Sequence, residues 1–180
     1  DARFAFGIGM RASLAGAMFL RPSPQWKGRV VNPFGDPIDG LGAVPRGETA
    51  VLIDAAPPAA MIRKRINRPS RTGVRAIDLF TPLCEGQRIG IFGGSGVGKS
   101  TLLGAMSRQN YAQVTVIALV GERNREVRDF IENELCPEGL KRSVVIVENS
   151  DRPAPWRIRA SFVALAFERY ILGYGQGILL

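Results

Sequence analysis

Residues 88–103 read RIGIFGGSGVGKSTLL, and the rest of the chain is interpreted around this stretch. Apart from Arg88, its first five residues are glycine or apolar, which is typical of a buried strand. Residues 93–100 fit the pattern G-x-x-x-x-G-K-[ST], the signature of a phosphate-binding loop between a strand and a helix. The sequence therefore predicts a buried strand at 88–92, a P-loop at 93–100 and a helix that begins near Lys99.

The residue types in this loop suit a polyphosphate. Glycine tolerates positive φ and lets backbone N–H groups approach an anion closely, and the start of the next helix adds unpaired N–H groups and a positive dipole end. The Lys99 ammonium can follow the β- and γ-phosphates, and the Ser100 hydroxyl can ligate Mg²⁺. The residues expected to hold a nucleotide are Gly93, Gly94, Ser95, Gly96, Val97, Gly98, Lys99, Ser100 and Thr101.

The alternative for this stretch is a glycine-rich turn that binds nothing. At ordinary residue frequencies the full pattern arises by chance in a chain of this length well under about 1% of the time. The pattern also stands between a strand-like and a helix-like segment, as a P-loop requires. Nucleotide binding is therefore the favoured interpretation.

The composition is that of an ordinary globular protein. With 46% hydrophobic residues in 180, the chain can bury a core of one domain, or of one domain plus a piece. No uncharged apolar run approaches the roughly 18 residues of a membrane span. Residues 1–20 are interrupted by Arg3 and Arg11 and lack an initiator Met and a clean apolar core, so no signal peptide is expected. These features predict a cytoplasmic protein.

Cysteine usage and charge argue against other kinds of site. Cys84 and Cys136 lack metal-ligand spacing and the sequence has no histidine, so a zinc site is not expected. Both cysteines are expected to be reduced thiols. The net charge of +8 comes mainly from arginine, without the charge blocks typical of nucleic-acid-binding tails. The densest basic group, at 63–75, is favoured as a solvated linker over a lipid or RNA contact. Nucleic acid is therefore not an expected partner.

Strand-like and helix-like stretches alternate after Val74. This alternation predicts an α/β fold with a parallel sheet. Beyond the P-loop segment, strands are expected at 114–120, at 144–147 and from Ile178, and helices at 99–108, at 125–135 and from the turn cluster at 150–155 to about Leu172. Cys136 and Pro137 are expected to end the second helix, and the third helix is expected to bury Ile158, Phe162 and Leu165.

The first 75 residues carry turn signals instead of this alternation. Residues 28–39 predict a short strand at 29–31 and a hairpin, because two turn signals follow that strand. Residues 40–75 are rich in Gly, Pro and Ala and predict an extended surface connection with one apolar run at 51–53. Residues 1–24 resemble the last strands of a unit that begins upstream.

An acidic residue follows the second predicted strand. Ligands of a parallel sheet bind beyond the carboxyl ends of its strands, so residues 121–126 are expected at the same edge as the P-loop. A carboxylate there can hold and polarise a water in line with the γ-phosphorus, which makes Glu122 a candidate catalytic residue. The alternative is an acidic residue that only favours the start of the next helix.

Three segments give the chain a family resemblance: GRVVNPFGDPIDG, GGSGVGKS and GERNREVRDFIE, at 28–40, 93–100 and 121–132. In this order they resemble the rotary-type hexameric ATPases related to the β subunit of F-type ATP synthase. Within that family, TGVRAIDLFTPLCEGQRIGIFGGSGVGKSTLL at 72–103 is most similar to the flagellar protein export ATPases. The resemblance extends over about residues 20–180.

The resemblance implies a RecA-like P-loop NTPase core, a homo-hexameric ring, and hydrolysis of ATP with Mg²⁺ to energise protein export. It implies a cytoplasmic location peripheral to the inner membrane, with export-apparatus proteins, stator or stalk regulators, and export substrates or chaperones as partners. In such enzymes the first Glu of the motif at 121–126 is the general base, here Glu122. Glu126 would act on the metal through its water shell, and Arg123 would position Glu122.

The resemblance also implies a domain division. Residues 1–24 would be the end of a small N-terminal β-barrel, residues 25–75 a hairpin and extended connection, and residues 76–180 a partial, incomplete RecA-like core. The Walker B Asp, the adenine pocket and the arginine finger of the family would lie beyond Leu180. We therefore expect the 180 residues alone to bind nucleotide weakly and to hydrolyse it negligibly. Asn124 departs from the family, whose flagellar members usually have Gly there.

Other interpretations remain open at this point. A virulence-type secretion ATPase, or the catalytic subunit of an F- or V-type ATP synthase, would share the same motifs. A non-catalytic fragment that binds nucleotide or a partner is an alternative of another class. A nucleic-acid motor with the same core is disfavoured, because no aromatic-rich nucleic-acid-binding segment precedes the P-loop.

Overall fold

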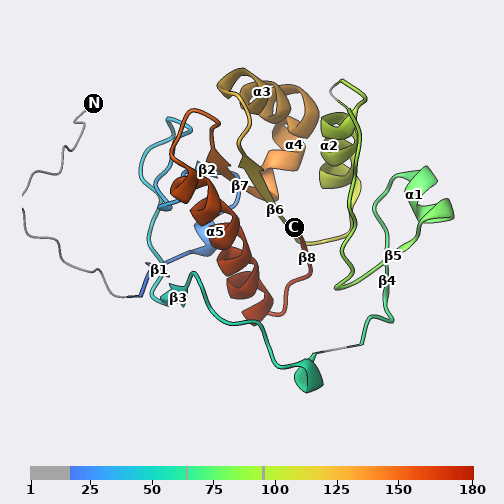
Figure 1. Cartoon of the computed structure of the whole chain (residues 1–180), viewed down its shortest axis with the longest axis horizontal. Helices are drawn as coiled ribbons and strands as arrows, with labels where there is room; N and C mark the ends of the chain where they lie inside the picture. The colour runs from blue at the N-terminus through green and yellow to red at the C-terminus, as the bar shows by residue number, and fades with distance from the viewer. Residues whose placement is uncertain (1–16, 64, 95) are drawn as a thin grey trace, which may run out of the picture.

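A four-stranded parallel sheet with the order β2-β7-β6-β8 lies at the centre of the computed structural model, which describes residues 17–63, 65–94 and 96–180 (Figure 1). Its strands are β2 (Val30–Val31), β6 (Val114–Val120), β7 (Ser143–Glu148) and β8 (Ile178–Leu179). The strands predicted at 114–120, at 144–147 and from Ile178 are confirmed, and so is the mixed α/β fold class with a parallel sheet.

The other elements surround this sheet. The helices are α1 (Arg75–Phe80), α2 (Lys99–Gln109), α3 (Asn124–Asp129), the π-helical η3 (Phe130–Leu135), α4 (Cys136–Lys141) and α5 (Ala154–Gly173), with short 3-10 turns η1 (Pro24–Trp26) and η2 (Ala60–Ile62). Two antiparallel pairs join β1 (Phe19–Leu20) to β3 (Val51–Leu52) and β4 (Pro69–Ser70) to β5 (Leu83–Cys84). Within the described ranges, no helix combines the length and apolar character that crossing a membrane requires.

Alternate residues of β6 and β7 face opposite layers of helices. On one face, Val144 and Ile146 pack in the cluster that contains Phe167 of α5. On the other face, Val145 and Val147 pack in the cluster that contains residues of α3 and η3. Because successive strand residues point to opposite sides, two nearly continuous apolar strands supply both cores. The sheet is therefore covered by helices on both faces, with α5 on one side in Figure 1.

The predicted buried face of α5 is wrong. Ile158, Phe162 and Leu165 are all exposed, at 59%, 43% and 41%. The residues that α5 turns toward the sheet are Ala160, Val163, Ala164, Phe167, Tyr170 and Ile171. The helix is apolar on more than one side, so its sequence is compatible with two different buried faces. The face that contains the small residues is the one that packs against the sheet.

The predicted end of the second helix at Cys136 is confirmed, but the further helix that follows it at once was not predicted. A helix predicted over 125–135 is present as α3 and η3, but helical structure continues through α4 to Lys141. Pro137 stands in the first turn of α4, where its missing N–H costs no helical hydrogen bond. Cys136 has a φ of 57°, so the chain changes direction at this residue and then resumes a helix.

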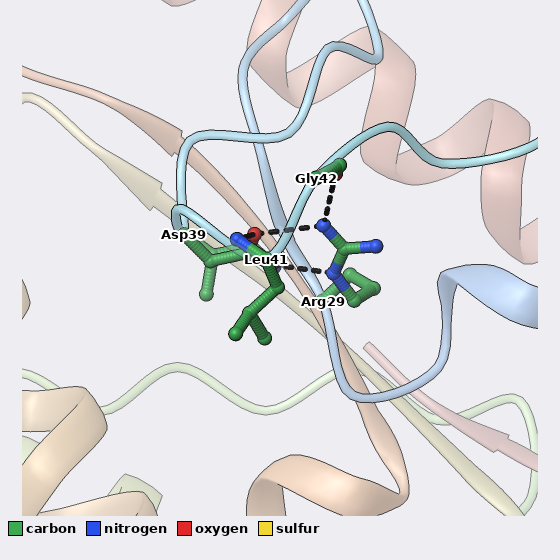
Figure 2. A network of polar contacts seen from close by, with 5 residues as sticks. Arg29, Asp39, Leu41 and Gly42 are labelled. Carbon is green, nitrogen blue, oxygen red and sulfur yellow. Dashed lines mark hydrogen bonds and ion pairs between the residues drawn. The ribbon is translucent and has the colours of Figure 1, made fainter.

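A polar network fixes the segment that follows β2 (Figure 2). Asp39 accepts hydrogen bonds from Arg29 Nε at 2.7 Å and Nη2 at 2.8 Å, and from the backbone N–H groups of Val30 and Leu41 at 3.0 Å each. Arg29 Nη2 also donates to the Gly42 carbonyl at 2.6 Å. The hydrogen bonds from Arg29 are the largest influence that lowers the pKa of Asp39 to about 2.

The predicted hairpin is confirmed, and it is joined to the main sheet. The chain turns after Val31 so that Val31 and Pro37 form an antiparallel bridge, and Ile38 N donates to the Val30 carbonyl at 2.9 Å. β2 itself pairs in parallel with β7, with Val30 opposite Val145. Residues 1–16, on which most of the predicted β-barrel end falls, lie outside the described residues.

Candidate functional site

The P-loop glycines have the backbone geometry that the sequence required of them. Gly96 and Gly98 have φ values of +75° and +93°, in the region that L side chains rarely adopt. A Cβ on Gly93 would lie 2.7 Å from Val97 Cγ2, so that position has no room for a side chain. Ser95 lies outside the described residues. The loop leads into α2, which begins at Lys99 as predicted and runs for 11 residues.

The Lys99 side chain folds back over the loop. Its Nζ donates to the Gly93 carbonyl at 2.7 Å and also to the Gly94 carbonyl. The neighbouring Ser100 is exposed, and its hydroxyl lies in the first turn of α2. An ammonium, a hydroxyl and the free N–H groups of a helix start form a donor set that fits a polyphosphate and a cation that prefers oxygen ligands.

Thr101 is committed to a contact within the protein. Its Oγ1 donates to Glu134 Oε1 at 2.6 Å, which joins α2 to η3. One turn later, a Cβ on Gly104 would lie 2.7 Å from the Glu134 carbonyl oxygen, so the two helical segments approach closely there. The Thr101 hydroxyl is therefore not free, and its backbone N–H is the group left to meet a nucleotide.

The strand predicted at 88–92 is wrong in this structure. These residues form no strand, and Ile89 and Phe92 are 44% and 96% exposed. A strand needs a neighbour for its backbone groups, and none of the described strands pairs with this segment. Without that neighbour its apolar side chains have nothing to pack against, although the loop that follows keeps its geometry.

Glu122 follows β6, beyond the carboxyl end of that strand. A hydrogen bond with the Glu126 carboxyl is the largest cause that raises the pKa of Glu122, followed by burial and by the negative charge of Glu126. The positive charge of Lys99 is the smallest of these influences and acts in the opposite direction on that pKa.

Arg123 contacts the second acid of the motif. Its Nη1 lies 3.6 Å from Glu126 Oε1, one turn along the start of α3. Both side chains are largely exposed, so this ion pair contributes little to stability. Its geometric consequence is that Glu126 stands between Arg123 and Glu122, so the predicted effect of Arg123 on Glu122 would pass through Glu126.

Two residues that the sequence analysis did not single out lie beside Glu122. Glu148 ends β7 opposite Val120, and its 5% exposed side chain has its pKa raised by burial. Asn149 comes next and donates from Nδ2 to Asn124 Oδ1. The rule that selected Glu122, namely the carboxyl end of a parallel strand, applies equally to β7 and would have found both.

Comparison with protein families identifies the fold to which these residues belong. The model described as "ATP synthase alpha/beta family, nucleotide-binding domain" matches residues 73–180, which include the P-loop, Glu122 and the sheet strands β6, β7 and β8. The chain belongs to the ATP synthase alpha/beta family. The expected family is thereby confirmed.

Similar members of the ATP synthase alpha/beta family include proteins named for flagella. The chain is 45% identical over 160 residues to the "Flagellum-specific ATP synthase" of Caulobacter vibrioides, which covers 89% of this chain and 36% of that protein. It is 49% identical over 152 residues to the protein of the same name from Bacillus subtilis, covering 84% of this chain and 34% of the relative. The chain thus spans about a third of the length of these relatives.

A solved structure from the same family shares the fold. It is described as the assembled ATPase EscN in complex with its central stalk EscO from the type III secretion system of enteropathogenic E. coli. The TM-score is 0.82 at 39% sequence identity, over 89% of this chain and 39% of EscN. This similarity supports the arrangement of the sheet and of the helices around it.

Proposed function

We propose that these residues form the nucleotide-binding part of an ATPase that energises protein export through the flagellar type III apparatus. The observation that carries the proposal is the P-loop, whose Gly96 and Gly98 have positive φ and which leads into α2 at Lys99, together with Glu122 at the end of β6. A cation for the terminal phosphates beside a carboxylate for a water is the arrangement that phosphoryl transfer to water needs. The flagellar names of the similar proteins support the choice of export as the use of that energy.

The chain's own residues have distinct roles in this proposal. The loop backbone and the start of α2 bind the phosphates, and Lys99 leaves its carbonyl partners to contact the β- and γ-phosphates. Glu122 orients a water and accepts its proton, and the raised pKa of its carboxyl makes the carboxylate a stronger base. Ser100 would hold Mg²⁺, which neutralises charge on the phosphates when bound, and Glu126 would act on it through water.

The assembly is proposed from a solved structure, and the location from the family resemblance. We propose a homo-hexamer that works with a stalk protein, since EscN is described in complex with its central stalk EscO. Export-apparatus proteins and export substrates or chaperones would be further partners. The location would be cytoplasmic and peripheral to the inner membrane, at the export apparatus.

Two experiments test the proposed function. Isothermal titration of the 180-residue chain with Mg-ATP, beside a phosphate-release assay, should give saturable binding with negligible turnover. A chimera, in which these residues replace the matching segment of the Caulobacter vibrioides relative, should hydrolyse ATP. Absence of Mg-ATP binding to the chain and of hydrolysis by the chimera would contradict the proposal.

Two other functions give different results in these assays or in a swimming assay. A non-catalytic binding module would bind Mg-ATP and leave the chimera inactive. A virulence-type secretion ATPase, favoured by the similarity to EscN, would hydrolyse ATP in the chimera but would not restore swimming to Caulobacter cells that lack their own flagellar enzyme.

A further inference from the structure

Two loops lie side by side where β6 and β7 end. We name residues 121–124 the Glu122 loop and residues 148–151 the Asn149 loop. The ladder between the strands ends with Val120 opposite Glu148. Backbone contacts continue past it, because Gly121 N donates to the Glu148 carbonyl at 2.8 Å and Ser150 N donates to the Glu122 carbonyl at 3.1 Å. The backbone of Glu122 is therefore tied directly to the Asn149 loop.

A side-chain bridge closes the same pair of loops. Asn149 Nδ2 donates to the side-chain oxygen of Asn124, the first residue of α3. Glu122 thus lies between two attachments: a backbone bond from Ser150 at its own carbonyl and an amide bridge two residues later. A change at Asn149 would move the Glu122 loop without touching the P-loop.

Stability alone does not account for an asparagine at position 149. Its Oδ1 atom is buried and has no hydrogen-bond partner among the described residues. A buried acceptor without a partner lowers the stability of a fold. An apolar residue of similar size would avoid that loss but could not donate to Asn124, so the donor is the property of Asn149 that this site uses.

We propose that Asn149 and Asn124 are positioning residues that hold Glu122 in the orientation needed to activate water for ATP hydrolysis. This inference rests on the proposed function and adds to it the groups that orient its base. Glu122 has an exposed side chain, and small displacements of a general base cost large factors in rate. The bridge limits those displacements by tying the Glu122 loop to the Asn149 loop.

The test uses the chimera with Caulobacter vibrioides and measures kcat and KM for ATP separately. Asn149→Ala and Asn124→Ala each remove one partner of the bridge and should lower kcat about tenfold, with KM within about twofold, because the phosphate contacts are untouched. Asn124→Asp keeps the accepting oxygen and should retain kcat within about threefold. Asn133→Ala is the matched control, since it removes an exposed amide whose one hydrogen bond to a described residue is to Asp129.

The outcomes separate the two ideas. Equal kcat values for the unmodified chimera and both alanine variants would overturn the inference and leave the proposed function standing. If the unmodified chimera is inactive and the 180-residue chain does not bind Mg-ATP, both the inference and the proposed function are overturned. If kcat falls in proportion to the fraction of protein that still binds ATP, and the thermal midpoint falls as well, the bridge serves only the stability of the fold. That result would also overturn the inference. If Asn149→Ala does not fold, Asn124→Ala breaks the same bridge from the exposed side.

Discussion

The two halves of the candidate site are built in different ways. Glu122 follows β6, which pairs with β7 along its length and is covered by helices on both faces. Lys99 follows a segment, 88–92, that has no strand neighbour among the described residues and exposes Phe92 almost completely. The P-loop nevertheless keeps the positive φ values of Gly96 and Gly98. Local loop geometry therefore depends on glycine and on the helix start, whereas burial of a strand depends on partners distant in sequence.

The largest expected effect is on the exposed half. Lys99→Ala removes the cation that contacts the terminal phosphates, so we expect Mg-ATP affinity of the 180-residue chain to fall more than about tenfold and hydrolysis by the chimera to fall about 10³-fold or more. Isothermal titration and phosphate release measure the two. Lys141→Ala, at an exposed lysine that ends α4, is the control and should change neither. Undiminished hydrolysis by the Lys99 variant would mean that the two halves do not act on one phosphate.

A change at Glu122, in the half of the site that follows the paired strand β6, should lower the rate of hydrolysis without lowering the affinity for Mg-ATP. Glu122→Gln keeps the shape of the side chain but removes its basicity, so we expect turnover in the chimera to fall about 10²- to 10³-fold, with Mg-ATP affinity within about threefold. Titration of the 180-residue chain and steady-state kinetics of the chimera provide the measurement. Brisk hydrolysis by the Gln variant would remove Glu122 from its proposed role.

The sheet and the segment 88–92 can also be compared by how much each contributes to the free energy of unfolding. Phe167 is fully buried on the sheet and stacks on Trp26 with ring centroids 5.6 Å apart. Phe167→Ala should lower the free energy of unfolding by about 3–5 kcal/mol, whereas Phe92→Ala, at a 96% exposed residue, should change it by less than about 0.5 kcal/mol. Urea denaturation of the 180-residue chain compares them. A large effect at Phe92 would show that segment 88–92 is packed in solution.

The smallest expected effect concerns the network that holds the segment after β2 beside the sheet. The folded pKa of Asp39 is about 2, below its ordinary value of 3.8. A carboxyl with a lowered folded pKa stabilises the fold above its unfolded pKa, and that contribution is lost as pH falls from about 4 to about 2. Asp39→Asn should therefore cost about 2 kcal/mol at pH 7 and should flatten the acid dependence of the urea midpoint in that window. An unchanged dependence would contradict the assigned pKa.

The most reliable predictions from the sequence concern features that neighbouring residues determine. The bounds of β6 follow from one apolar run between turn signals, and the start of α2 follows from the motif that ends in Lys99. The place of Glu122, just after β6, followed from the rule that ligands of a parallel sheet bind beyond the carboxyl ends of its strands. Each of these features needs only neighbouring residues or one topological rule.

The failures have a common physical cause, which is a dependence on partners that a linear pattern does not specify. The strand at 88–92 needed a neighbour to pair with. The buried face of α5 depended on which of two apolar stripes fits the sheet, and Phe162 belongs to the exposed one. Asn149 acquires its interest only because β7 lies beside β6 and brings it to Asn124.

The pairing of β2 with β7 has a practical consequence for dissecting this protein. The family's nucleotide-binding region begins at residue 73, yet Val30 and Val31 form the outermost strand of its sheet. A truncation that starts at residue 73 would remove that outer strand. The backbone amides and carbonyls along one side of β7 would then be unpaired, which favours self-association. The smallest autonomous unit therefore starts upstream of Gly28, whose N–H already bonds to Ser143.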